Sequence, residues 1–139
     1  MVADNEVRKA SEQFYSALNS MLNGNAGPLS EIWSHGAAVT TMHPIGGREV
    51  GWDKVKGSWE QVSKLVKDGK VQLKDQHIHV AGDAAYEVGI EAGSFSLNGQ
   101  KVSVEHRVTN VYRREGSAWK IVHHHTDISP AMQDILKRL

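Results

Sequence analysis

Three consecutive histidines near the carboxyl end are the residues whose type and spacing best suit chemistry. They follow Trp119-Lys-Ile-Val in a segment that alternates apolar and polar residues, as a β-strand does. Successive side chains of a strand point to opposite faces, so His123 and His125 are expected to share the face of Trp119, with His124 opposite. Histidine is the side chain most easily poised for proton transfer near neutral pH. The strand therefore predicts a small-molecule pocket with His123 and His125 as candidate catalytic residues.

Other interpretations of these histidines stay open. His123 and His125 could be core histidines whose ring nitrogens are satisfied by backbone or carboxylate partners. Their face could instead pack against a second subunit. On the opposite face, a dimer contact is one open interpretation for His124.

Arg107 is a further candidate catalytic residue. It shares a face of the expected strand 101–114 with Thr109, and Glu91 on the neighbouring strand could pair with it. An arginine between apolar neighbours must be paired if it is buried. Two interpretations remain: a structural ion pair with Glu91, or a clamp for a carboxylate or enolate. Glu91 and Thr109 are accordingly expected among the ligand-binding residues.

Two His-x-His pairs raise the question of a metal. His77 and His79 form the first pair, and His123 and His125 the second. Alternating histidines on a strand can bind zinc or iron when a third ligand is nearby. Neither pair is followed by a glutamate at the cupin spacing, and the first half of the chain is too helical for that fold. We therefore expect no metal site and no cofactor, with His77 and His79 on a solvent face or beside a partner.

The elements that must position these residues are helical in the first half and extended in the second. Apolar residues from Val7 to Leu22 recur at three- and four-residue steps, which predicts a helix capped at Asp4 or Asn5 and ended by Gly24. Further helices are expected at 28–33 and 51–68, with a short strand at 38–43 between them. The strands expected in the second half are 71–80, 84–97, 101–114 and 118–128, followed by a short helix or frayed tail at 130–139.

Helices followed by a run of hairpins indicate the α+β class, with helices packed on one face of a curved antiparallel sheet. Asn98-Gly99 is the strongest hairpin signal in the chain. At 139 residues, the chain is expected to form one domain, 1–139. Several large apolar side chains are expected to form the core and the wall of a pocket for an apolar ligand. The expected ligand-binding members of this set are Tyr15, Trp33, Met42, Trp59 and Trp119.

The composition excludes several classes of function. Sixteen basic residues balance sixteen acidic ones, so no basic face for nucleic acid is expected. The absence of cysteine excludes disulfides and thiolate chemistry. We find no signal-peptide pattern at the N-terminus and no apolar run near the roughly 20 residues that span a bilayer, so a cytoplasmic protein without membrane contact is expected. The eight histidines should make stability or activity sensitive to pH around neutrality.

Four segments carry a resemblance to a known family. They are Trp33-Ser-His-Gly, Met42-His-Pro-Ile-Gly-Gly, Gly51-Trp-Asp, and Arg107-Val-Thr-Asn-Val-Tyr-Arg-Arg running to Trp119-Lys-Ile-Val-His-His-His. With the order of elements, they make nearly the whole chain resemble the SnoaL-like branch of the nuclear transport factor 2-like superfamily. That superfamily includes ketosteroid isomerases, polyketide cyclases, scytalone dehydratase and the association domain of calcium/calmodulin-dependent kinase.

The resemblance implies a cone-shaped, strongly bent sheet wrapped round a long N-terminal helix, a pocket at the wide end, and a homodimer formed through the sheet. It also implies a catalytic role for His43, which occupies the place of the general-base aspartate of ketosteroid isomerases. The tyrosine of the isomerase oxyanion site falls at Phe14, with Tyr15 one residue away. The protonated acid of that site falls near Thr109 or Asn110, where no carboxyl is present, so steroid isomerisation is not expected.

Two functions are compatible with these observations. The first is a cofactor-independent isomerase, dehydratase or cyclase that uses histidine-mediated proton transfer on a small apolar or cyclic carbonyl compound. In it, His43 and one of His123 or His125 would move protons, and Arg107 or Tyr15 would stabilise an oxyanion. The second is a non-catalytic ligand-binding or association module. A catalytic site would need at least two polar groups that converge on one ligand atom.

Overall fold

The computed structural model describes residues 2–139 and contains one six-stranded sheet and four helices. The helices are α1 (Val2–Met21), α2 (Leu29–Ile32), α3 (Trp52–Ser63) and α4 (Pro130–Lys137). The strands are β1 (Thr40–His43), β2 (Gly46–Val50), β3 (Val66–Ala81), β4 (Ala84–Leu97), β5 (Gln100–Glu115) and β6 (Ala118–Thr126). They lie in the order β2-β1-β6-β5-β4-β3, and among these described strands only the β1–β6 pair is parallel.

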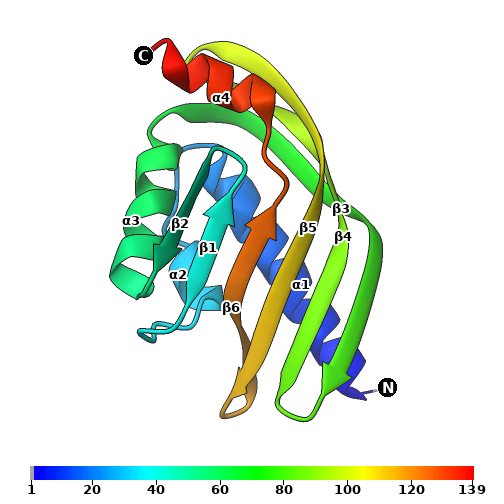
Figure 1. Cartoon of the computed structure of the whole chain (residues 1–139). Coiled ribbons are helices and arrows are strands. Elements are labelled where there is room, and N and C mark those ends of the chain that lie inside the picture. The colour runs from blue at the N-terminus through cyan, green and yellow to red at the C-terminus, as the bar shows by residue number, and fades with distance from the viewer. Residues whose placement is uncertain (1) are drawn as a thin grey trace.

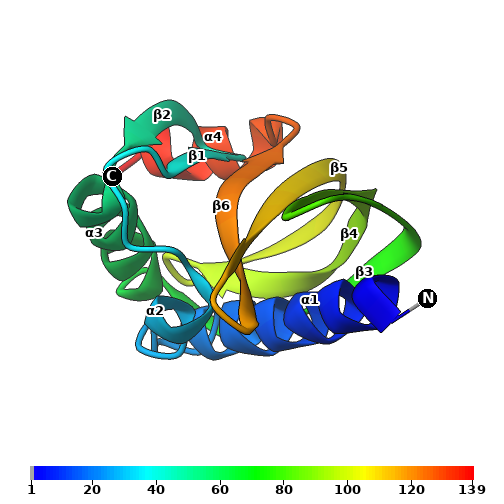
Figure 2. The same ribbon diagram turned by 90° about the horizontal axis from the view of Figure 1, so that it is seen from below.

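The sheet curves round α1, and this arrangement confirms the expected α+β fold with its bent sheet and long first helix (Figures 1 and 2). The apolar stripe of α1 explains the packing, since Val7, Phe14 and Leu18 are all almost completely buried. Helix α3 lies beside the β1–β2 end of the sheet, and α4 crosses above its upper end (Figure 1). The concave side of the sheet therefore faces the helices, and none of the helices within residues 2–139 covers its convex side.

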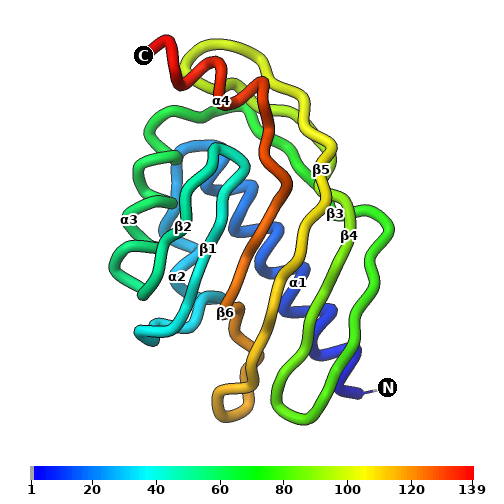
Figure 3. Tube along the Cα trace, viewed as in Figure 1, coloured from blue at the N-terminus to red at the C-terminus, as the bar shows by residue number. Residues whose placement is uncertain are grey.

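Two bulges in β3 give the sheet its bend. The register with β4 shifts between Lys67 and Lys70 and again between Lys74 and His77. Opposite the first bulge, a Cβ on Gly93 would lie 2.0 Å from the carbonyl oxygen of Lys70. Only glycine permits this close approach of two backbones. The bend is visible where β3 and β4 turn over α1 in the Cα trace (Figure 3).

Several boundaries differ from those that the sequence predicts: α1 already includes Val2, before the expected cap at Asp4 or Asn5, and β3 begins at Val66 rather than at residue 71. Pro44 and Ile45 form a tight turn after the expected short strand, and β2, which the sequence does not predict, follows as the antiparallel partner of β1. Helix α3 ends at Ser63, five residues before the expected end, because Val66 already pairs with Leu97 of β4. The last segment, expected to be a short helix or a frayed tail, forms the helix α4, and the Ser129 hydroxyl accepts a hydrogen bond from the amide of Met132.

The register of β6 has the largest consequence for the site. Val111 of β5 pairs with His123, but the next residue, Tyr112, pairs with Ile121. Val122 is therefore an extra residue, and the bulge reverses the facing of every side chain after it. As a result, Trp119, Ile121 and His124 are all buried.

Candidate functional site

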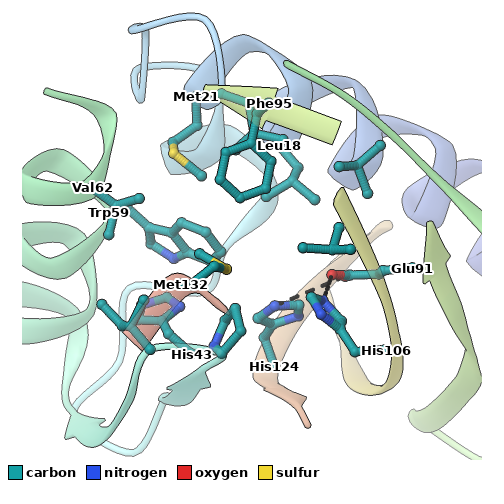
Figure 4. Close-up of a pocket in the computed structure, with 15 residues that line it drawn as sticks. Leu18, Met21, His43, Trp59, Val62, Glu91, Phe95, His106, His124 and Met132 are labelled. Carbon is teal, nitrogen blue, oxygen red and sulfur yellow. Dashed lines mark hydrogen bonds and ion pairs between the residues drawn. The ribbon is translucent and has the colours of Figure 1, made fainter. Parts of the chain in front are cut away.

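An apolar pocket opens between the concave side of the sheet and helices α1, α3 and α4, and four polar side chains line it (Figure 4). The polar residues are His43 from β1, Glu91 from β4, His106 from β5 and His124 from β6. The remaining walls are apolar. They are formed by Leu18, Met21, Leu22, Pro44, Ile45, Trp59, Val62, Val71, Phe95, Val104 and Met132.

The bulge at Val122 decides which of the three histidines reaches this pocket. The expectation that His123 and His125 point inward is wrong, because strict alternation along β6 does not hold across the extra residue. His124 lines the pocket and is 2 % exposed. His125 is exposed on the outer face, and the half-buried His123 contacts the Thr40 hydroxyl through Nδ1 at 2.6 Å.

Glu91 is the centre of the polar group in the pocket. Its Oε2 accepts a hydrogen bond from the Tyr15 hydroxyl at 2.9 Å, and its Oε1 accepts one from His106 Nε2 at 2.9 Å. Burial by itself would raise the pKa of the Glu91 carboxyl. The hydrogen bond from His106 and the nearby His124 ring outweigh burial and lower this pKa below its ordinary value. Glu91 is therefore an ionised carboxylate inside an apolar cavity.

His124 faces Glu91 across a short gap. Its Nδ1 lies 2.7 Å from Asn110 Oδ1, and its Nε2 lies 4.0 Å from Glu91 Oε2. An amide oxygen only accepts, so Nδ1 carries the proton and Nε2 of the neutral ring has a free lone pair. Burial lowers the pKa of His124 to about 4, despite the opposing attraction of Glu91. At neutral pH this residue is an uncharged imidazole whose basic nitrogen faces the carboxylate.

His43 stands on the other side of His124, as the close-up shows (Figure 4). Its ring centroid lies 6.4 Å from that of His124 and 4.5 Å from that of Trp59. The Ser58 hydroxyl donates to the carbonyl of Val55, so it accepts a hydrogen bond from His43 Nε2 at 2.9 Å. Burial, with a smaller contribution from His124, lowers the pKa of His43 to about 3. His43 therefore lines the pocket as a neutral ring with its Nδ1 unprotonated.

The open space inside the pocket is small. It measures about 50 Å³, whereas sites for drug-sized ligands are usually about 300–1,000 Å³. Met132 from α4 closes one side, and α4 is attached to the β1–β2 turn by a hydrogen bond from the Ser129 amide to the Pro44 carbonyl at 2.8 Å. A ligand of more than a few non-hydrogen atoms must therefore displace Met132 or another apolar wall residue.

Arg107 does not reach the pocket. Its guanidinium forms two hydrogen bonds to the Asp127 carboxylate, at 2.9 and 3.0 Å, and its side chain is 81 % exposed. The paired Asp127 raises the pKa of Arg107 above its ordinary value. The proposed pair of Arg107 with Glu91 is wrong because the residue of β5 that faces Glu91 on the inner side is His106. Thr109 lies with Arg107 in a groove on the outer face of the sheet.

The other expected ligand-binding residues divide between the pocket and the core. Trp59 lines the pocket, and Tyr15 supports it from behind through Glu91. Trp33 is 1 % exposed and packs against Trp59 in the core, outside the pocket lining. Trp119 is also a core residue, whose indole nitrogen donates to Glu6 at 3.0 Å. Met42 is half-buried on the side of β1 opposite His43.

Two further residues of the site, His106 and Asn110, were missed as candidates. Both lie on the inner face of β5, in alternation with Val104, Val108 and Tyr112, all of which are buried. This alternation is present in the sequence and could have identified both polar residues as inward-facing. For the described part of the chain, residues 2–139, no group of three or more histidine, cysteine or acidic side chains has the arrangement of a metal site.

The sequence matches the model of the SnoaL-like domain over residues 7–132, which is almost its full length. The chain belongs to the SnoaL-like family. A search among curated proteins finds no match to this SnoaL-like protein. No helix within residues 2–139 is long and apolar enough to cross a membrane.

Solved structures resemble this SnoaL-like protein over most of their length. A candidate dehydratase of the NTF2-like family from Streptomyces avermitilis is 26% identical, with a TM-score of 0.78 over 90% of this chain and 94% of the other. An uncharacterised cystatin-like protein from Caulobacter vibrioides is 17% identical, with a TM-score of 0.74 over 98% of each chain. A candidate calcium/calmodulin-dependent protein kinase type II association domain from Thiobacillus denitrificans is 23% identical, with a TM-score of 0.71 over 86% and 92%. The last two similarities show the fold alone.

Proposed function

We propose that this SnoaL-like protein is a cofactor-independent enzyme that moves a proton within a small carbonyl compound, as an isomerase, dehydratase or cyclase does. The observation that carries the proposal is the pair of bases in an apolar cavity, His124 Nε2 and Glu91 Oε2, separated by 4.0 Å. A ligand atom to one side of the line that joins them, at about 2.8 Å from each, would be within hydrogen-bond distance of both. Convergence of two such groups on one atom is what distinguishes a catalytic pocket from a simple apolar cavity.

His124 is the proposed general base. In its neutral form it takes a proton from a carbon next to the carbonyl through Nε2, and an enolate forms. The resulting imidazolium is then stabilised by the Glu91 carboxylate and by the hydrogen bond from Nδ1 to Asn110 Oδ1. Returning this proton to another carbon completes an isomerisation. Delivering it to a departing hydroxyl group completes a dehydration.

The surrounding residues support this assignment. Tyr15 and His106 each donate a hydrogen bond to Glu91, which holds the carboxylate in place beside His124. His43, on the opposite wall, is the proposed second proton-transfer residue because its unprotonated Nδ1 belongs to a ring that lines the same cavity. The apolar walls exclude water and strengthen the interaction between the developing charges.

The description of the Streptomyces avermitilis relative as a candidate dehydratase is compatible with this chemistry. Dehydration of a β-hydroxy carbonyl compound begins with the same proton abstraction as isomerisation. The small cavity favours a compact substrate. We therefore infer that the substrate is a small ketone or β-hydroxy carbonyl compound, presented with its acidic C–H bond toward His124.

Hydrogen–deuterium exchange tests this proposal and does not require the product to be identified. Small cyclic ketones and β-hydroxy carbonyl compounds are incubated with the protein in D2O, and loss of the α-proton signal is followed by ¹H NMR. We expect catalysed exchange for at least one compound, reduced by about a hundredfold or more in His124→Gln. His125→Gln is the matched control, because it removes the neighbouring exposed imidazole and should retain the wild-type rate.

The same experiment addresses the second function, a non-catalytic module. Binding of a panel compound without exchange, under conditions in which the chemical shifts of pocket residues change, would favour a module. Exchange that His124→Gln leaves unchanged would remove His124 from the mechanism and leave His43 as the base to test.

A further inference from the structure

A second buried carboxylate, Glu87 of β4, lies behind the pocket and does not line it. It is 0 % exposed, so its charge requires partners inside the protein. Three donors supply them. Asn110 Nδ2 and the Tyr112 hydroxyl lie 3.0 and 2.9 Å from Oε1, and Gln76 Nε2 lies 2.6 Å from Oε2. The proposed reaction gives this carboxylate no role in contact with a ligand.

Glu87 is nevertheless joined to the base in the pocket by a single residue. The side chain of Asn110 donates from Nδ2 to Glu87 Oε1 and accepts at Oδ1 from His124 Nδ1. Asn110 and His124 are both buried, so each depends on protein groups for these hydrogen bonds. The two ends of the Asn110 amide thus connect a carboxylate on β4 with an imidazole on β6.

These hydrogen bonds form a series that runs from Arg8 to His124, and the donors and acceptors along it fix the direction of each bond. At the surface end, the Arg8 guanidinium donates to Gln76 Oε1, which leaves Gln76 Nε2 to donate to Glu87. A carboxylate only accepts, so the amide of Asn110 must present its nitrogen to Glu87 and its oxygen to His124. The oxygen in turn requires a proton on His124 Nδ1. The Tyr15 hydroxyl, which accepts from Asn110 Nδ2 at 3.1 Å, agrees with the same orientation.

We propose that Glu87 is a positioning residue: through Asn110 it holds His124 in the tautomer that carries its proton on Nδ1 and keeps Nε2 free to act as a base. The tautomer is a structural property and does not depend on any reaction. Its catalytic meaning rests on the proposed function. A buried donor or acceptor left without a partner changes an equilibrium by about 10- to 100-fold, which is enough to make one tautomer dominant.

Replacing the Glu87 carboxylate with an amide should reverse which group donates and which accepts in the hydrogen bonds from Glu87 to His124. In Glu87→Gln, Arg8 still orients Gln76, so the introduced amide presents its oxygen to Gln76 and its nitrogen to Asn110. Asn110 then turns its oxygen toward this nitrogen and its nitrogen toward His124, and its hydrogen bond to the Tyr15 hydroxyl is lost while that hydroxyl still donates to Glu91. His124 Nδ1 must lose its proton to accept this hydrogen bond, and the proton moves to Nε2.

The tautomer is measured directly from the ¹⁵N shifts of the two ring nitrogens, with the signals of His124 assigned by comparison with His124→Gln. We expect the wild type to have a protonated Nδ1 and Glu87→Gln to have a protonated Nε2. Tyr112→Phe is the matched control, because it removes another hydrogen bond from the same Oε1 without changing what Asn110 faces. It should keep the wild-type tautomer.

A double variant provides the rescue. The double variant Glu87→Gln/Gln76→Glu exchanges the carboxylate and the amide of these two positions. The carboxylate at position 76 then accepts hydrogen bonds from Arg8 and from the amide introduced at position 87. The oxygen of that amide then faces Asn110 again, so the wild-type tautomer should return. This variant, with the wild type, carries the test if Glu87→Gln alone does not fold.

The proposal is overturned by a wild-type protein with its proton on Nε2, by an unchanged tautomer in Glu87→Gln, by a changed tautomer in Tyr112→Phe, or by a double variant that stays inverted. These results are separate from the fate of the proposed function. If the tautomers behave as described but His124→Gln exchanges deuterium at the wild-type rate, the positioning by Glu87 holds and the catalytic role of His124 does not.

Discussion

The buried histidines of the pocket should make this SnoaL-like protein unstable in mild acid. His43 and His124 have pKa values of about 3 and about 4 in the folded state, whereas an unperturbed histidine has a pKa of about 6.5. Between pH 6.5 and these folded values, the unfolded chain binds protons that the folded chain excludes. The free energy of unfolding therefore falls as the pH is lowered through this range, and it does not change above it on account of these two groups.

The magnitude follows from the width of the range. Each group contributes about 1.4 kcal/mol per pH unit, so at pH 5 each removes about 2 kcal/mol and the two together about 4 kcal/mol. This is a large part of the roughly 5–15 kcal/mol that stabilises an ordinary domain. The lowered pKa of Glu91 acts in the same direction but only below about pH 4.5, where its carboxylate begins to be protonated in the unfolded chain.

Urea unfolding followed by circular dichroism at pH 7 and pH 5 measures this difference. His43→Gln and His124→Gln should each reduce the loss of stability between the two pH values by about half, whatever their effect at pH 7. His77→Gln serves as a control in which an exposed histidine is replaced. A wild-type free energy of unfolding that differs by less than about 1 kcal/mol between pH 7 and pH 5 would show that the two rings are not held neutral.

Three further predictions concern the sheet, the pocket and the outer face. Gly93→Ala should destabilise the protein by at least about 2 kcal/mol in urea unfolding, because the added methyl group would meet the Lys70 carbonyl at 2.0 Å. The control Gly57→Ala in α3 should not destabilise the protein, because a Cβ there meets nothing within 4 Å. Met132→Ala should lower the free energy of unfolding by about 2 kcal/mol or more, because a buried core contact is lost. It should also increase the binding of an apolar dye, because the pocket loses part of its wall, and unchanged dye binding would contradict the assignment of Met132 to that wall. We expect a homodimer through the outer face of the sheet, which the helices leave open and on which Ile90 of β4 is half-buried, so Ile90→Lys should give a monomer in light scattering. A wild type that is itself monomeric would exclude a dimer through this face.

Periodicity in the sequence is sufficient to predict the helices and strands whose apolar residues recur at regular intervals. The stripe of α1 from Val7 to Leu22 and the hairpin at Asn98-Gly99 are both confirmed, and β4 has the expected bounds. In these segments each local preference agrees with the final packing. The inner face of β5, with His106 and Asn110, has the same regular alternation and is equally predictable from the sequence.

The errors arose where a neighbouring strand decides the structure. The end of α3 was placed too late because Val66 continues the helical stripe, yet it pairs with Leu97 of β4. The facing of the three histidines was wrong because nothing in Ile121-Val-His marks Val122 as an extra residue. A bulge is defined by the register of two strands, so a pattern read along one strand cannot reveal it.

The bulge at Val122 also determines which changes in the gene would leave the pocket unaltered. Substituting His123 or His125 leaves the ring that faces Glu91 untouched. Deleting the single residue Val122 would leave it untouched as well, because Ile121 and His123 already pair with the consecutive residues Tyr112 and Val111, so the deletion only turns the bulge into a regular ladder. Homologues that carry the same three histidines but lack the additional residue would therefore present the same central imidazole to their ligands.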